Sequence, residues 1–145
     1  MHITLLFHAA IVTFMIFFSS VVAPAVFKTL SQKAVGAFLR VLFPRMFIFG
    51  LGLSLCASLA AAFVVFGADA SPENAKNALW LSLLSAVGFA VNAFVVTPII
   101  NRNRDGMLAE DPVAITRFKQ FHFLSVGIFM VQLGASLYLL IVNLG

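Results

Sequence analysis

Four apolar windows without a charged residue dominate the pattern of hydrophobic and polar positions along the chain. They cover residues 3–26, 46–67, 78–100 and 121–142. Each window passes the roughly 20 apolar residues that a helix needs to cross a bilayer. Backbone groups in lipid have to be satisfied within helices or closed barrels, and these windows lack the alternation of barrel strands. The pattern therefore predicts an all-α integral membrane protein, folded as an antiparallel four-helix bundle.

Basic residues gather in two of the three segments between the windows. The first segment carries Lys28, Lys33, Arg40 and Arg45, and the third carries Arg102, Arg104, Arg117 and Lys119. The second segment carries Lys76 alone. Short loops rich in Lys and Arg stay on the cytoplasmic side. We therefore expect a multi-pass protein of the cell inner (plasma) membrane whose two termini both lie outside the cytoplasm.

The first basic segment has a helical pattern of its own. Its apolar side consists of Val35, Phe38, Leu39 and Leu42. Lys33 and Arg40 fall on the other side, Ser31 is a candidate N-cap, and Pro44 is expected to end the helix. This pattern predicts an amphipathic interfacial helix between the first two spans. Either it only connects the spans and sets their orientation, or its cations bind anionic lipid headgroups.

The third segment predicts a turn followed by a long helix. Residues 101–106 are polar and are expected to form the turn. Asp111 and Pro112 provide an N-cap and a first-turn proline. From Pro112 the helical pattern continues without a breaker into the last window. The fourth helix is therefore expected to extend into the cytoplasm.

Two sequences of the first segment carry a resemblance to a known family. VVAPAVFKTL at 21–30 and FLRVLFPRMF at 38–47 resemble the small four-span membrane proteins grouped as domain of unknown function 4149, which include transmembrane protein 205-like proteins. NRNRD at 101–105 and FHFLS at 121–125 look like the other two signatures of that family. The resemblance implies four spans over the whole chain. The resemblance assigns no activity to the chain, because the family itself has no settled biochemical activity.

The composition agrees with one four-span membrane domain over residues 1–145. Hydrophobic residues make up 62% of the chain and charged residues 10%, whereas soluble domains contain roughly 25% charged residues. The net charge of +4 would suit nucleic acid. The cations lie beside apolar windows, however, so membrane topology explains them and a nucleic-acid partner is discarded. Cys56, the single cysteine, is expected to be a small packing residue.

Small residues recur every four positions along the second window. They are Gly50, Ser54, Ser58 and Ala62. Such a face lets another helix approach closely. The other helix belongs either to the same chain, or to a second copy or another membrane protein. Gly127 and Gly134, one heptad apart in the fourth window, provide a similar face.

The windows contain no Asp, Glu, Lys or Arg. Intramembrane carboxylates usually carry the protons of coupled transporters, so a proton-driven exporter is disfavoured. Asn92 and Ser54 lie at a similar depth, and we expect a hydrogen bond between them that joins the second and third helices.

Histidine provides the one argument for a cofactor. His8 in the first window is a candidate axial ligand of haem. His122 lies at the other end of the bundle, roughly 25 Å away at 1.5 Å per residue, so the two cannot share one iron. The alternative is that His8 hydrogen-bonds to a neighbouring helix. No metal-spaced cluster and no catalytic residues are recognised.

The remaining candidate site lies on the cytoplasmic side. There a cluster of polar residues would bind an anionic headgroup or a phosphate-bearing ligand. Its members are Lys33, Arg40, Arg45, Arg102, Arg104, Asp105, His122 and Ser125. Alternatively, Asp105 and the arginines only brace the loop. The predicted function is structural, lipid-interacting or accessory, and the alternatives are a haem-binding oxidoreductase using His8 and a small-solute facilitator.

Overall fold

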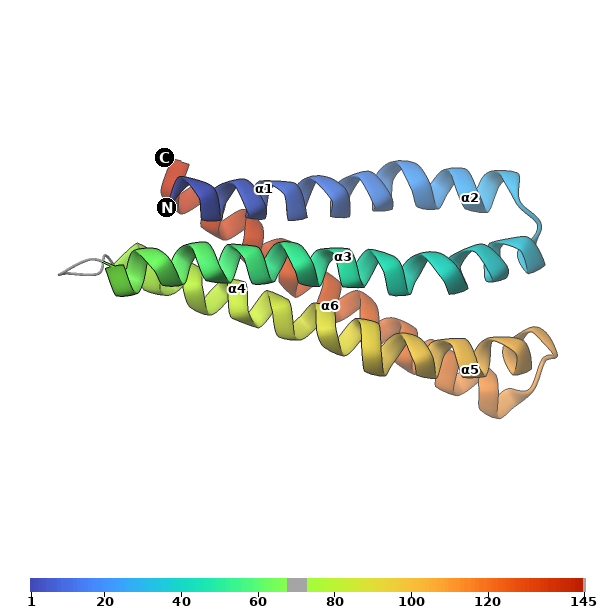
Figure 1. The fold of residues 1–145 in the computed structure, drawn as a ribbon. Helices are drawn as coiled ribbons and strands as arrows, with labels where there is room; N and C mark the ends of the chain where they lie inside the picture. The colour runs from blue at the N-terminus through green and yellow to red at the C-terminus, as the bar shows by residue number, and fades with distance from the viewer. Residues whose placement is uncertain (68–72, 145) are drawn as a thin grey trace.

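The computed structural model describes residues 1–67 and 73–144. These residues form four long helices and no strand, which confirms the all-α prediction (Figure 1). In chain order the elements are α1 (His2–Phe17), η1 (Phe18–Val22), α2 (Ala23–Thr29), α3 (Gln32–Gly67), α4 (Glu73–Val91), η2 (Asn92–Val96), α5 (Thr97–Leu108) and α6 (Pro112–Leu144). The first long helix consists of α1, η1 and α2, and the third consists of α4, η2 and α5.

Each long helix is long and apolar enough to cross a membrane. Large apolar side chains point outward from all of them, including Leu6, Phe63, Trp80 and Phe123. Water solvates such a surface poorly, whereas the hydrocarbon core of a bilayer accommodates it. The chain is therefore a multi-pass membrane protein.

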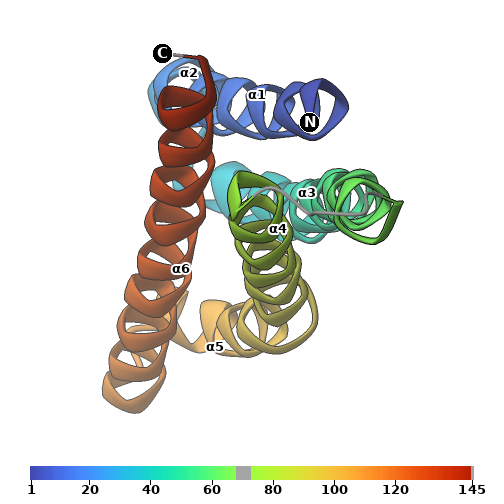
Figure 2. The same ribbon diagram turned by 90° about the vertical axis from the view of Figure 1, so that its left-hand side faces the viewer.

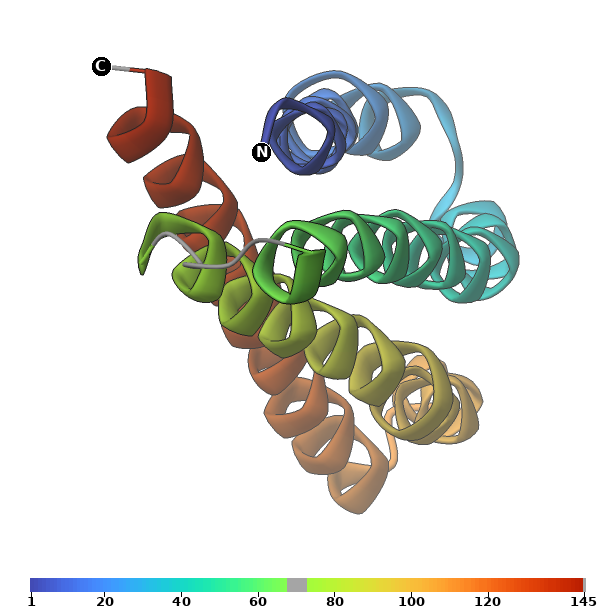
Figure 3. The ribbon, with the colours of Figure 1, turned by 60° about the vertical axis from the view of Figure 1, so that its left-hand side comes forward.

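The four long helices form two hairpins. The first hairpin joins the first long helix to α3 through residues 30–31, and the second joins the third long helix to α6 through residues 109–111. Both chain termini lie at one end, which we call the terminal end (Figure 1). The opposite end, with residues 28–40 and 102–119, is called the basic end. The first long helix and α6 diverge toward the basic end, as Figure 2 and Figure 3 show.

Three prolines lie within the long helices. Pro24 and Pro98 each follow a five-residue π-helical segment, η1 or η2. Proline lacks an N–H and its ring clashes with the carbonyl four residues earlier, and a π turn just before it widens the backbone there. Pro44 lies inside α3, which continues unbroken. The break predicted at Pro44 is therefore wrong, because helix interiors in membranes tolerate proline where neighbouring groups satisfy the freed carbonyl.

The predicted amphipathic segment is consequently the first part of α3. Its apolar side packs on the first long helix, where Val26, Val35 and Leu39 form a buried cluster. Ser31 caps the helix as predicted, since its Oγ accepts a hydrogen bond from the Ala34 N–H at 3.4 Å. The placement of this segment among lipid headgroups stays a prediction.

The turn predicted at residues 101–106 is wrong. These residues belong to α5, which ends at Leu108, and the chain reverses at Glu110 with a φ of 61°. The predicted start of the fourth helix is confirmed, because Asp111 Oδ1 accepts a hydrogen bond from the Val113 N–H at 3.0 Å. In the second connector, residues 68–72 lie outside the described residues, and Glu73 already begins α4.

The predicted small-residue face of α3 packs inside the chain. A Cβ atom on Gly50 would lie 2.5 Å from Phe89 Cε1 of α4, so only glycine admits the ring there. Ser54 and Ser58 are buried and Ala62 is partly buried. A homo-oligomer or partner contact through this face stays a prediction.

Other small residues point outward. Gly127 and Gly134 are exposed, and a Cβ atom at either would meet no described atom within 4 Å. Cys56 is also exposed. The prediction that Cys56 is a packing residue is therefore wrong, because it lies outside the buried side of α3.

Candidate functional site

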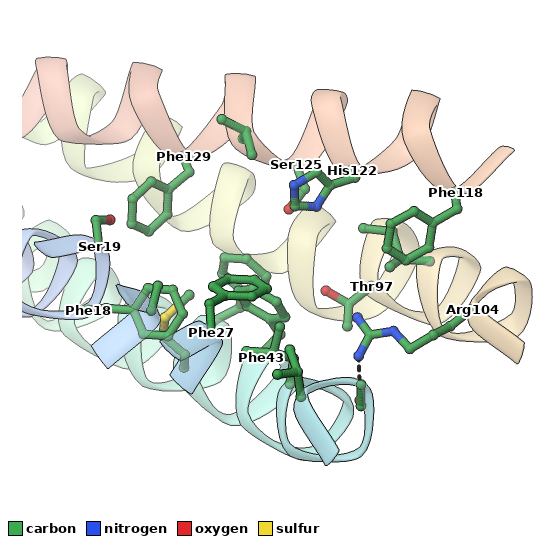
Figure 4. A pocket seen from close by; sticks show the side chains of 18 of the residues that line it. Phe18, Ser19, Phe27, Phe43, Thr97, Arg104, Phe118, His122, Ser125 and Phe129 are labelled. Atoms are coloured by element: carbon green, nitrogen blue, oxygen red, sulfur yellow. Dashed lines mark hydrogen bonds between the residues drawn. The ribbon is translucent and has the colours of Figure 1, made fainter. Parts of the chain in front are cut away.

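A cavity of about 480 Å³ lies between the two hairpins near the basic end. All four long helices contribute to its walls. Figure 4 shows the residues that border it, among them Phe18, Phe27, Phe43, Thr97, Arg104, His122, Ser125 and Phe129. Volumes of this size are typical of pockets for one small molecule.

Aromatic side chains form most of the wall toward the bundle interior. The Phe18 and Phe43 rings meet edge to face with centroids 5.6 Å apart, and Phe43 stacks on Phe47 at 5.9 Å. Phe47 also belongs to the buried core with Phe89 and Phe129. This part of the cavity can only bind apolar groups.

Arg104 forms the polar end of the cavity. It is 4% exposed although it carries a full charge. One guanidinium nitrogen, Nη1, donates to the Gly36 carbonyl at the start of α3, and the guanidinium carbon lies 5.8 Å from the centroid of the Phe118 ring. Its Nε has no hydrogen-bond partner among the described residues, and neither has Oγ1 of buried Thr97. Unsatisfied buried polar atoms of this kind cost about 1–3 kcal/mol each.

His122 lies beside this end on α6. Its ring stacks on Phe118 with centroids 5.9 Å apart and an interplanar angle of 9°. Ser125, one turn further along α6, also borders the cavity. The Phe118 ring thus contacts both the His122 ring and the Arg104 guanidinium group.

An ion pair between Arg40 and Asp105 lies on the outer side of the basic end. Arg40 of α3 and Asp105 of α5 are 2.6 Å apart, with 41% and 74% of their side chains exposed. Exposed pairs contribute about 0–1 kcal/mol. The pair is the contact expected of Asp105 under the bracing interpretation. It holds Asp105 against Arg40, and no ion pair of the described residues includes Arg104.

The predicted polar cluster is only partly assembled. Arg104, His122 and Ser125 border the cavity, and Arg40 and Asp105 pair beside it. The other predicted members, Lys33, Arg45 and Arg102, are exposed and do not line the cavity.

Sequence analysis missed the apolar wall and Thr97. The aromatic residues of the wall come from three long helices, and no local pattern relates them. A signal for Thr97 was present, however. The sequence Val-Val-Thr-Pro at 95–98 repeats Val-Val-Ala-Pro at 21–24, and the Ala23 of that first copy also lines the cavity.

His8 lies in a second polar cluster, at the terminal end. Its Nε2 is 2.8 Å from Ser82 Oγ on α4, and its Nδ1 is 3.0 Å from Ser136 Oγ on α6. His8 is fully buried. It joins three helices, as expected of a hydrogen-bonded histidine in a span. Haem at His8 stays an alternative to the prediction that no cofactor binds, and one of these hydrogen bonds would have to open before a ring nitrogen could ligate iron.

The predicted hydrogen bond between Asn92 and Ser54 is wrong. Asn92 Nδ2 donates instead to the Ser125 carbonyl of α6 at 3.3 Å, and Ser54 Oγ has no partner among the described residues. The reason is the orientation of the third long helix about its own axis: Asn92 points at α6, whereas Phe89 fills the contact with α3.

Within residues 1–67 and 73–144 no three His, Cys, Asp or Glu side chains come together as in a metal site.

Comparison with known proteins identifies the family. Residues 6–108, most of the chain, match the family described as Domain of unknown function (DUF4149). The chain belongs to this family. No curated protein and no solved structure matches it. The family resemblance noted from the sequence is thereby confirmed over residues 6–108, which include Arg104, whereas the signature at 121–125 lies outside the match and stays a prediction.

Proposed function

We propose that this protein binds an anionic amphiphile, with a carboxylate or phosphate head and one acyl chain, in the cavity at the basic end. The observation that carries the proposal is Arg104, a buried arginine with no anionic partner at the end of an otherwise apolar cavity. A buried, unpaired charge costs several kcal/mol. An anionic head at Arg104 would remove that cost, and guanidinium groups suit carboxylate and phosphate geometry.

The residues of the cavity wall favour an alkyl chain as the remaining part of the ligand. The Phe18, Phe43 and Phe47 rings offer contacts to an alkyl chain, each buried methylene being worth about 0.8 kcal/mol. Thr97 Oγ1 and His122 add neutral hydrogen-bonding groups near the head. The volume of about 480 Å³ suits one chain and a compact head better than a whole two-chain lipid.

The route into the cavity follows from the orientation that the basic loops favour. With the basic end in the cytoplasm, the cavity lies at the depth of the cytoplasmic leaflet of the inner or plasma membrane. The first long helix and α6 diverge there (Figure 3). An amphiphile would therefore enter sideways from that leaflet, with its head at the level of Arg104.

Direct binding measurements test the proposal. Purified protein in nanodiscs is titrated with radiolabelled oleate, with oleyl alcohol, and with lysophosphatidic acid. We expect both anions to bind at least about tenfold more tightly than the alcohol, since a charge-assisted hydrogen bond is worth about 1.5–3 kcal/mol. The two anions distinguish a carboxylate ligand from a phosphate ligand.

Matched variants locate the site. Arg104→Gln should remove the preference for anions over the alcohol, whereas Arg102→Gln, two positions earlier on α5 and exposed, should leave it unchanged. Equal affinity of the wild type for oleate and oleyl alcohol contradicts the proposal. So does an Arg104→Gln protein that keeps the preference.

A further inference from the structure

The two hairpins are structural repeats of each other. The π segments begin at Phe18 and Asn92, and the Val-Val-x-Pro sequences place Pro24 and Pro98 two residues after their ends. His8 and Ser82, which hydrogen-bond to each other, are separated by the same 74 positions. An offset of 74 positions thus relates the two π segments, the two prolines and the hydrogen-bonded residues His8 and Ser82 of the first and third long helices.

Burial follows the same offset. The pairs of corresponding residues that are both buried in the two long helices are Thr4 and Ala78, His8 and Ser82, Ile11 and Ser85, Val12 and Ala86, Met15 and Phe89, and Val26 and Ile100. The first and third long helices therefore turn corresponding faces toward the interior of the bundle. Corresponding helices of the two hairpins start from the same end of the molecule (Figure 1), so the two hairpins run parallel, as the repeats of some transporters do.

The cavity lies between equivalent positions of the two repeats. Four of the lining residues of α3 have a lining counterpart on α6 at a shared offset of 79 positions, and Ala23 corresponds to Thr97 at the offset of 74. The lining pairs are Leu39 and Phe118, Phe43 and His122, Met46 and Ser125, and Phe47 and Val126. At three of the five pairs the second hairpin adds a polar group where the first hairpin has an apolar one.

The opposite end of the interface between the repeats is closed by hydrogen bonds. His8 of the first hairpin contacts Ser82 and Ser136, both of the second hairpin. These contacts involve neutral groups with no ion pair. Intramembrane hydrogen bonds contribute only about 0.6 kcal/mol each on average. Opening this end must also separate the buried apolar cluster of Ala61, Ala78 and Leu139.

The contact between α3 and α4 provides a pivot. There α3 packs closely on α4, with Gly50 against Phe89. Transporters built from structural repeats expose a central site alternately to the two sides by rocking one repeat against the other. Closure at the terminal end together with a cavity toward the basic end is the arrangement of one such state.

We infer that the two hairpins rock against each other and thereby move the anionic amphiphile between the two leaflets of the bilayer. In the present state the His8 contacts are made and the cavity faces the cytoplasmic leaflet. In the alternate state the His8 contacts are open, and the head leaves Arg104 and passes between the two hairpins to the other leaflet. This inference rests on the proposed function, and it adds transbilayer movement to binding.

A removable cross-link tests the inference. The substitutions His8→Cys and Ser136→Cys are made in a Cys56→Ala background, so that oxidation can join only the two hairpins at the terminal end. The reconstituted protein is assayed with fluorescent lysophosphatidic acid. Binding is measured by titration, and transbilayer movement by the fraction of probe that serum albumin extracts from the outer leaflet.

We expect the oxidised protein to bind the probe with unchanged affinity and to lose transbilayer movement, which a thiol reductant then restores. The Cys56→Ala background protein, treated with the same oxidant, should keep moving the probe. The inference is overturned if the cross-linked protein moves the probe as fast as the reduced one, or if the wild type binds it and never moves it. Absence of binding would instead overturn the proposed function, and the inference with it.

Discussion

At the scale of single residues, burial distinguishes one cation near the basic end from the others, although all carry the same charge. Of the cations at the basic end, Arg104 alone is buried in the described part of the chain, while Lys33, Arg45 and Arg102 are exposed. From the sequence alone these cations cannot be distinguished, since all lie in basic segments next to apolar windows. Only the structure distinguishes a charge that needs a partner from charges that water and headgroups solvate.

His8 is the residue whose replacement should affect stability most at the terminal end. His8→Ala removes two hydrogen bonds and leaves a void, so we expect the free energy of unfolding to fall by about 2–4 kcal/mol. Thermal or SDS-induced unfolding of the purified protein measures the loss. His2→Ala, at an exposed position of the same helix, should change it by less than about 0.5 kcal/mol. Equal stability of the two variants contradicts the structural role of His8.

The same proteins test the haem alternative. Their optical spectra are recorded after purification from haem-replete cells, air-oxidised and then reduced with dithionite. Because both ring nitrogens of His8 are hydrogen-bonded within the bundle, we expect a colourless wild type. A Soret band that shifts on reduction and is lost in His8→Ala would make this a haem protein and contradict that expectation.

At the scale of helices, the contact between α3 and α4 depends on one glycine. Gly50→Ala places a methyl group within 2.5 Å of the Phe89 ring, and overpacking of this kind costs about 1–3 kcal/mol. Gly52→Ala, two positions along α3, meets no described atom within 4 Å and should be neutral or slightly stabilising. Denaturation of both variants measures the difference. A Gly50→Ala protein as stable as Gly52→Ala would show that α3 and α4 do not pack at this point.

The elements also show how far the sequence determines the fold. Apolar windows predict the four long helices and the caps at Ser31 and Asp111, because span length and capping depend on local residues. The same local reasoning fails at Pro44 and at residues 101–106, where helix continues through a proline and through polar residues. Continuation there depends on contacts with other helices, such as that of Arg104 with the Gly36 carbonyl, which a single segment does not reveal.

The candidate site was predictable to a smaller extent. Arg104, His122 and Ser125 could be selected from the sequence because polar residues next to an apolar window are few. The cavity itself could not, since its aromatic wall combines residues that lie far apart in the chain, such as Phe18, Phe47 and Phe129. The repeat of Val-Val-x-Pro was visible in the sequence, but only the two π segments give it a structural meaning.

At the scale of the whole molecule, orientation decides which leaflet the cavity serves. The basic loops predict that residues 28–40 and 102–119 face the cytoplasm. Single cysteines in a Cys56→Ala background test this: Lys33→Cys and Arg117→Cys lie at the basic end, and Lys76→Cys lies near the other end, early in α4. In intact cells, a membrane-impermeant maleimide should label Lys76→Cys and spare the other two until the membrane is opened.

The opposite labelling pattern would reverse the topology without changing the binding geometry. Arg104 would then serve the outer leaflet, and the His8 contacts would close the cytoplasmic side. Labelling of all three cysteines in intact cells would instead indicate a mixed orientation, which the strong asymmetry of the basic residues disfavours. Because the two hairpins are parallel repeats, their like ends face the same side in either orientation, so one labelling experiment fixes the direction of access for both halves of the cavity.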